Sequence, residues 1–146
     1  MDEILNEKLI ELDVSVKDRE DAVRRAGELL RKNEMVSYEY IDCMIKYLDE
    51  FGPYIVITKS VAMPHARPED GALKSGLSLV ILKNPVNFGN TQNDPVKYIF
   101  GLSAVDNNEH IHTISKLALL LDDEKFMSLL DNVKTKSEII EYIKEI

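Results

Sequence analysis

Cysteine and long apolar runs are scarce in this sequence of 146 residues. The single cysteine, Cys43, cannot form an internal disulfide, which is typical of proteins from a reducing cytoplasm. No apolar run approaches the roughly 20 residues that a membrane-spanning helix needs. The first residues, Met1-Asp2-Glu3, are acidic and lack the basic-then-apolar order of a signal peptide. We therefore expect a cytoplasmic protein that would serve any membrane process through a partner.

The sequence also lacks an excess of positively charged residues. Lys and Arg total 18 and Asp and Glu total 26, so the net charge is -8 and we expect no nucleic-acid partner. Hydrophobic residues make up 45% of the chain, which is too much for a disordered protein. Glycine (6) and proline (5) are few and form no linker, and internal repeats are absent. Residues 1–146 are therefore expected to form a single domain.

Strand-like and helix-like segments alternate along the chain. Short runs of β-branched and aromatic residues predict four strands, and apolar residues at helical spacing predict four helices, with Asp18 and Ser37 as N-caps of the first two. The strands are expected at residues 9–16, 54–57, 76–82 and 96–105, and the helices at 19–31, 38–51, 107–121 and 137–144. This interspersed order predicts an α/β fold with a mixed sheet covered by helices on both faces.

An irregular loop is predicted at residues 61–71, because Pro64 and Pro68 exclude a helix interior and a central strand there. The loop carries His65, and a neutral imidazole is a good nucleophile near neutral pH. Arg67 follows two residues later and offers a fixed cationic fork to an anion. On these residues alone, a histidine that is merely solvated in a loop is an open alternative.

The other two histidines differ in their place on the predicted helix at 107–121. His110 falls in its first turn, where unpaired backbone N–H groups favour an anion. It also lies on the apolar stripe, whereas His112 points about 160° away, toward the polar side, and is expected to be solvated without a function. The stripe consists of Ile114, Leu117, Ala118 and Leu121. A core histidine satisfied by a backbone carbonyl is the alternative for His110.

The positions of His65 and His110 suggest one shared site. In open α/β sheets, ligands gather at the carboxyl ends of strands, where helix N-termini also point. His65 follows one predicted strand and His110 opens the helix after another. Two imidazoles, the Arg67 guanidinium and a helix N-terminus would then converge on an anion, which suits a transient phosphoryl group on His65.

Rival chemistries fit less well. A zinc site fails because His110 and His112 point apart and no pair has the spacing that shares a helical face. Cys43 lies within a predicted helix and is not followed by a phosphate-binding loop, so a phosphatase-type nucleophile is excluded. No glycine-rich phosphate loop occurs anywhere, which argues against a nucleotide-dependent kinase.

The segment around His65 resembles the active-site segment of the enzyme IIA components of the bacterial sugar phosphotransferase system, fructose/mannitol class. The segment reads VAMPHARPE at residues 61–69. Three further stretches are similar to the ascorbate-type proteins of that class, namely GPYIVI at 52–57, PVNFG at 85–89 and NDPV at 93–96. DNNEHI at 106–111 resembles the second histidine motif of the family.

The resemblance implies a three-layer α/β/α sandwich and a phosphotransferase without metal or cofactor. The family's nucleophile maps onto His65, which would accept a phosphoryl group from the phosphohistidine of the carrier HPr. It would pass that group to an enzyme IIB, in this branch to a cysteine, for uptake of ascorbate or a related carbohydrate through a membrane IIC. The supporting histidine maps onto His110, and Arg67 could add charge. A regulatory protein of the nitrogen type, which controls partners by its phosphorylation state, is the alternative.

Two positions depart from the family pattern. Family members often have glycine at the position of Ser60, where a tight turn with positive φ is convenient. Some mannitol-type members carry an arginine on the second helix that supports the phosphoryl group. The predicted helix at residues 38–51 contains no arginine, so Arg67 is the candidate to replace it.

Overall fold

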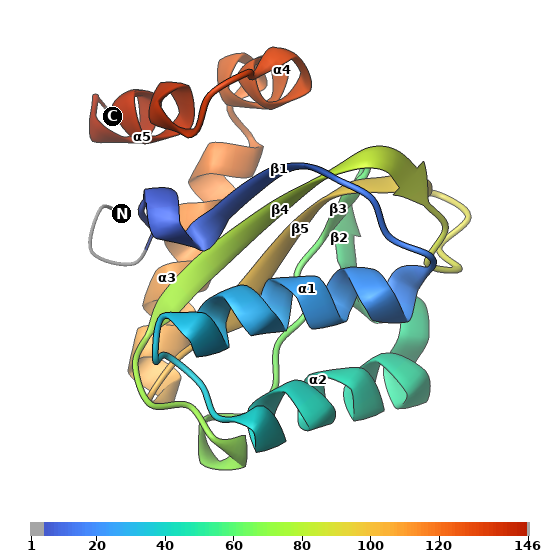
Figure 1. Ribbon diagram of the computed structural model, residues 1–146, viewed down its shortest axis with the longest axis vertical. Coiled ribbons are helices and arrows are strands. Elements are labelled where there is room, and N and C mark those ends of the chain that lie inside the picture. Colours follow the sequence, from blue (N-terminus) through green and yellow to red (C-terminus); the bar gives the residue numbers. More distant parts are fainter. Residues whose placement is uncertain (1–4, 146) are drawn as a thin grey trace.

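A mixed five-stranded sheet forms the centre of the computed structural model, which describes residues 5–145 (Figure 1). The strands are β1 (Ile10–Val14), β2 (Val56–Thr58), β3 (Val61–Ala62), β4 (Gly76–Val86) and β5 (Val96–Ser103). Their order across the sheet is β1-β4-β5-β3-β2. The pairs β1–β4 and β3–β5 are parallel, and β4–β5 and β2–β3 are antiparallel. The predicted α/β class with a mixed sheet is confirmed.

Helices cover both faces of this sheet. The helix α1 (Arg19–Lys32) packs on β4 and β5 with α2 (Tyr38–Phe51) beside it, and α3 (Asn107–Leu121) lies on the opposite face (Figure 1). The chain ends with α4 (Glu124–Asn132) and α5 (Lys136–Lys144). The described residues also form three short 3-10 helices, η1 (Glu7–Leu9), η2 (Gly52–Ile55) and η3 (Pro68–Asp70). Within residues 5–145, no helix combines the length and the apolar character that crossing a membrane requires.

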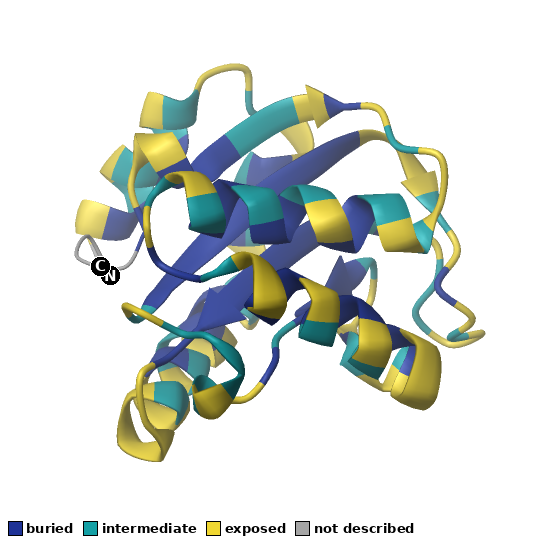
Figure 2. Ribbon diagram, turned by 60° about the horizontal axis from the view of Figure 1, so that its bottom comes forward, coloured by how far each residue is buried: buried dark blue, intermediate teal, exposed yellow. Residues whose placement is uncertain are grey.

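The first two helices begin where the sequence predicts. Asp18 caps α1, because its side chain accepts a hydrogen bond from the backbone N–H of Asp21 at 2.9 Å. Ser37 occupies the N-cap position of α2, although its side chain makes no capping hydrogen bond. The apolar faces of both helices are buried toward the sheet, and exposed residues lie on the outside (Figure 2).

One glycine sets the distance between α1 and the sheet. Gly101 of β5 lies against α1, and a Cβ atom there would come 2.5 Å from the Ser78 hydroxyl and 3.1 Å from the Cβ of Ala26. That hydroxyl is itself fixed, because it donates a hydrogen bond to the carbonyl of Ala26 at 2.8 Å. The close approach of helix and sheet therefore needs glycine at this position.

The structure corrects the strand predictions near the loop. The first half of the predicted strand at 54–57 belongs to η2, since Pro53 favours a tight helical turn after α2, and the second half belongs to β2, which begins at Val56. Val61 and Ala62, predicted as loop, form β3, because Pro64 and Pro68 lie beyond these two residues. The strand predicted to end at 82 continues to Val86 as β4.

The helix predictions also need two corrections. The short helix α4 was not predicted, although Phe126 and Leu130 are spaced as on one face of a helix and Asp123 caps its first turn. The buried side of α3 carries Thr113, Leu117 and Leu120, whereas Ala118 is exposed. Residues 117–121 are apolar all round, so their spacing alone does not define which side faces the sheet.

The turn between β2 and β3 has the backbone conformation expected for a glycine. Ser60 adopts a φ of 66°, in the left-handed region. Three backbone hydrogen bonds hold it there: Ser60 donates to the carbonyl of Asn93, and its own carbonyl accepts from Lys97 and Tyr98. The departure at Ser60 therefore leaves the turn in place and is compensated by these bonds.

Candidate functional site

The parallel pairing of β3 and β5 brings the two candidate histidines to one edge of the sheet. His65 follows β3 by three residues and forms an isolated parallel bridge with Leu102 of β5. The helix α3, which begins four residues after β5, carries His110 in its first turn. The centroids of the two imidazole rings are 5.2 Å apart, and the ring planes are tilted by 58°. The predicted convergence at the ends of two strands is confirmed.

One nitrogen of the His65 ring is held by the backbone. Its Nδ1 lies 2.9 Å from the carbonyl oxygen of Met63. Because a carbonyl oxygen only accepts hydrogen bonds, Nδ1 must carry the proton in this contact. The neutral ring then has its lone pair on Nε2, which no other described residue contacts by a hydrogen bond. His65 is half-buried rather than fully solvated, so it differs from an ordinary loop histidine.

His110 is held at the start of α3. The N-cap Asp106 accepts a hydrogen bond from the backbone N–H of Glu109 at 2.8 Å, which fixes the first turn. Among residues 5–145, the buried Nε2 of His110 has no hydrogen-bond partner. Burial, followed by the positive charge of a protonated His65, lowers the pKa of His110. A histidine with a lowered pKa is mostly neutral at neutral pH. The ring of His110 makes no hydrogen bond to a carbonyl within residues 5–145, so it does not fit the alternative of a core histidine satisfied by a carbonyl.

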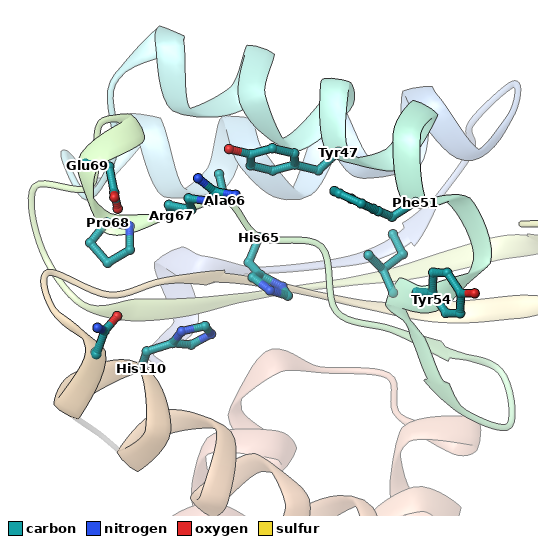
Figure 3. Close-up of a pocket in the computed structure, with 11 residues that line it drawn as sticks. Tyr47, Phe51, Tyr54, His65, Ala66, Arg67, Pro68, Glu69 and His110 are labelled. Atoms are coloured by element: carbon teal, nitrogen blue, oxygen red, sulfur yellow. The ribbon is translucent and has the colours of Figure 1, made fainter.

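The two histidines line an open cleft of about 660 Å³ (Figure 3). One end is polar and includes Arg67, Glu69 and Asn107. The other end is formed mainly by apolar and aromatic side chains from α2 and η2, namely Tyr47, Phe51, Tyr54 and Ile55. Phe51 and Tyr54 are 50% and 83% exposed, so the cleft has an apolar rim of the kind that a protein partner covers.

Arg67 supplies the positive charge at this cleft. Its guanidinium carbon lies 5.8 Å from the centre of the Tyr47 ring, and the side chain is exposed. No ion pair within the described part of the chain involves Arg67. The α2 positions that face the cleft are Tyr47 and Phe51, so the second helix offers aromatic rings where some relatives are expected to offer an arginine.

Other sequence candidates lie outside the site. His112 is exposed and does not line the cleft. Cys43 is half-buried on α2, and burial together with the charge of Asp70 raises the pKa of its thiol, so it is not a thiolate at neutral pH. Across residues 5–145, no group of three or more His, Cys, Asp and Glu side chains could hold a metal ion.

Besides the aromatic and apolar residues of the rim and Glu69, four residues at the site were not identified from the sequence. Asn107 is the first residue of α3 and lines the cleft, and a signal was available because it follows the capping Asp106. Tyr40, Tyr47 and Asp70 hold the loop after His65 through hydrogen bonds. The two tyrosines lie seven residues apart on α2, a spacing that places them on one face, but the contact with a distant loop has no local signal.

Comparisons with known proteins identify similar chains. Residues 3–146 match the family model described as "Phosphoenolpyruvate-dependent sugar phosphotransferase system, EIIA 2". The ascorbate-specific PTS system EIIA component of Escherichia coli K12 is 35% identical over 143 residues, which cover 97% of this chain and 93% of that protein.

Two solved structures extend the likeness to three dimensions. The mannitol-specific cryptic phosphotransferase enzyme IIA of Escherichia coli superposes with a TM-score of 0.87 and 34% identity, over 99% of this chain and 97% of that one. A chain of the complex of enzyme IIAMTL and phosphorylated enzyme IIBMTL from Escherichia coli superposes with a TM-score of 0.84 and 30% identity, over 97% and 98% of the two chains.

Proposed function

Because this chain belongs to the EIIA 2 family of the phosphoenolpyruvate-dependent sugar phosphotransferase system, we propose that His65 is its phosphorylated residue. Members of this family are phosphotransferases that work through a phosphohistidine intermediate. In the proposed cycle, the protein accepts a phosphoryl group from the phosphohistidine of HPr and passes it to an enzyme IIB. The observation that carries the assignment is the pairing of His65 with His110 in an open cleft, 5.2 Å apart.

The reacting atom follows from the hydrogen bond of His65. With its proton on Nδ1 and donated to the Met63 carbonyl, the ring has a lone pair on Nε2. That lone pair forms a bond to phosphorus, the P–N bond of the donor breaks, and its electron pair returns to the donor imidazole. The proton on Nδ1 stays in place throughout, so the Met63 carbonyl also stabilises the positive ring that forms. Discharge is the reverse step, with the acceptor nucleophile at phosphorus and the electron pair returned to Nε2.

His110 and Arg67 are suited to stabilise the phosphoryl group during transfer. Negative charge is spread over the equatorial oxygens of phosphorus in the transition state, and fixed donors and cations lower its energy. His110 is neutral and half-buried, so it can offer one N–H without bringing a second charge beside His65. Arg67 brings a guanidinium that is not engaged in an ion pair among the described residues. The N-terminus of α3 adds a favourable dipole.

The acceptor and the solute follow the relatives. One solved relative is a complex with a phosphorylated enzyme IIB, which supports an enzyme IIB as acceptor here, through a cysteine thiolate as the resemblance implies. The curated relatives at 35% identity are named ascorbate-specific, so we propose uptake of ascorbate or a related carbohydrate through a membrane IIC. Cytoplasmic HPr as the donor implies that the protein works in the cytoplasm.

Intact-protein mass spectrometry tests the proposal. The protein is incubated with phosphoenolpyruvate, enzyme I and HPr, as wild type and as His65→Ala, with His112→Ala as the matched control. We expect wild type and His112→Ala to gain one acid-labile phosphoryl group and His65→Ala to gain none. Absence of the gain on wild type, with an HPr that phosphorylates another enzyme IIA, would overturn the assignment. If the group is gained but no enzyme IIB removes it, the regulatory alternative replaces transport.

A further inference from the structure

Two tyrosines of α2 contact the backbone that follows His65. Tyr40 is 1% exposed, and its hydroxyl accepts a hydrogen bond from the N–H of Ala66 at 3.0 Å and donates one to the carbonyl of Leu102 at 2.7 Å. Tyr47 lies two turns later, and its hydroxyl donates to Oδ2 of Asp70 at 2.9 Å. Both contacts end within a few residues of the proposed nucleophile.

The Tyr40 hydroxyl takes the place of a bond of the sheet. His65 and Leu102 form a parallel bridge, and the N–H of Leu102 donates to the carbonyl of Pro64 at 3.1 Å. In a regular parallel ladder, the next bond runs directly from the N–H of Ala66 to the carbonyl of Leu102. The Tyr40 hydroxyl stands between these two groups and relays that bond. Burial raises the pKa of Tyr40 to about 12, so the hydroxyl keeps the proton that the relay needs.

Tyr47 contacts Arg67, the residue after Ala66, in two ways. The Asp70 oxygen that accepts from Tyr47 also accepts from the backbone N–H of Arg67 at 2.9 Å. The Tyr47 ring also lies 5.8 Å from the guanidinium carbon of Arg67. One side chain thus contacts the Arg67 side chain directly and its backbone through Asp70.

We propose that Tyr40 and Tyr47 are positioning residues, whose hydroxyls fix the loop so that Nε2 of His65 and the guanidinium of Arg67 act on the same phosphoryl group. The proposal rests on the proposed role of His65. Through these two hydrogen bonds, Tyr40 links the residue after His65 to β5. Tyr40 is buried, so it contacts no partner surface and acts on the rate of transfer alone.

The test compares Tyr40→Phe and Tyr47→Phe with Tyr38→Phe. Tyr38 is on the same helix, is 61% exposed, and its hydroxyl makes no hydrogen bond among the described residues, so it controls for loss of a tyrosine hydroxyl from α2. Single-turnover transfer from phosphorylated HPr is measured at several donor concentrations, with melting temperatures in parallel.

We expect Tyr40→Phe to lower the rate constant at saturating donor roughly tenfold to hundredfold, with the half-saturating donor concentration unchanged. Tyr47→Phe is expected to lower it by about threefold to tenfold, because its hydroxyl acts through Asp70. Tyr38→Phe is expected to match wild type. Wild-type rates in both variants, or a loss confined to the donor affinity, would overturn the proposal. Tyr47→Phe, at the protein surface, carries the test even where Tyr40→Phe unfolds.

A second readout separates this proposal from the proposed function. Nitrogen-15 NMR of the His65 ring reports its tautomer and surroundings without any phosphoryl donor. We expect Tyr40→Phe to change the His65 ring shifts relative to Tyr38→Phe. Unchanged ring shifts would overturn the positioning role, whether or not the wild type is phosphorylated. Changed shifts with an unphosphorylated wild type would show that Tyr40 positions the ring, but would reject the phosphocarrier function and with it the action on a phosphoryl group.

Discussion

The imidazole rings of His65 and His110 lie 5.2 Å apart, although 45 positions separate the two residues in the sequence. One ring belongs to the loop after β3, and the other to the first turn of α3. Their approach depends on the parallel pairing of β3 with β5, so the pair exists only in the folded protein. This relationship makes the function of each residue testable separately.

Replacement of His110 by alanine should slow transfer without abolishing it. The nucleophile stays intact, but the phosphoryl oxygens lose one donor, and we expect the rate constant to fall about tenfold to hundredfold. Rapid-quench measurement of transfer from phosphorylated HPr gives this value, with His112→Ala as the control on the same helix. Wild-type rates in His110→Ala would remove the residue from the site.

Stability in mild acid should depend on His110. Its folded pKa lies below the ordinary value of 6.5, chiefly because of burial. The unfolded chain therefore binds a proton there before the folded protein does, so this contribution is complete above pH 6.5 and is lost as the pH falls through the folded pKa. Urea unfolding at about pH 7.5 and about pH 5.5 should show a smaller loss of unfolding free energy for His110→Asn than for wild type. An equal loss in both proteins would contradict the lowered pKa.

The charge of Arg67 should matter more than its packing. We expect Arg67→Gln to reduce the transfer rate by about tenfold, because an exposed cation is partly replaced by solvent, and Arg67→Lys to retain part of the rate. The backbone N–H of Arg67 still donates to Asp70 in both variants, so the loop keeps its shape. Arg24→Gln, an exposed arginine of α1, is the matched control. An equal effect of Arg67→Gln and Arg24→Gln would indicate only general electrostatics.

The contact between β5 and α1 should not tolerate a methyl group. A Cβ at Gly101 would lie 2.5 Å from the Ser78 hydroxyl, so we expect Gly101→Ala to lower the free energy of unfolding by about 1–3 kcal/mol. Removal of that hydroxyl in Ser78→Ala/Gly101→Ala should restore part of the loss, because Ser78 and the new methyl share one space. Denaturant unfolding of the two single variants and the double variant measures the coupling. Strict additivity would show that the clash with Ser78 is not the cause.

The fold could largely be predicted from local patterns. Local sequence signals predict the N-cap positions of Asp18 and Ser37 and the apolar stripe of α1. The structure confirms all three. The two-residue strand β3 could not be predicted, because it is too short for a periodic signal and exists through pairing with β5. The helix α4 was missed although the sequence holds its signals, namely the capping Asp123 and the helical spacing of Phe126 and Leu130.

The candidate site divides in the same way. The edge of the sheet that gathers His65 and His110 follows from where each stands relative to a strand and a helix. The relay from Ala66 through Tyr40 to Leu102 joins three distant segments, and no spacing rule gives it. The candidate reactive residues were thus recognisable by their chemistry, whereas the residues that contact their loop could be identified only from the three-dimensional structure.

The hydrogen bond from Nδ1 of His65 to the Met63 carbonyl also affects how the donor and acceptor proteins can bind at the cleft. It leaves one ring nitrogen, Nε2, in the open cleft for both accepting and donating the phosphoryl group in the proposed cycle. Donor and acceptor must therefore take turns, and each excludes the other while it is bound. In every cycle the donor protein must dissociate before the acceptor binds, so a long-lived complex with either partner would stop phosphoryl transfer. One nitrogen can therefore serve two proteins only if both complexes dissociate quickly, which means that each partner binds with low affinity.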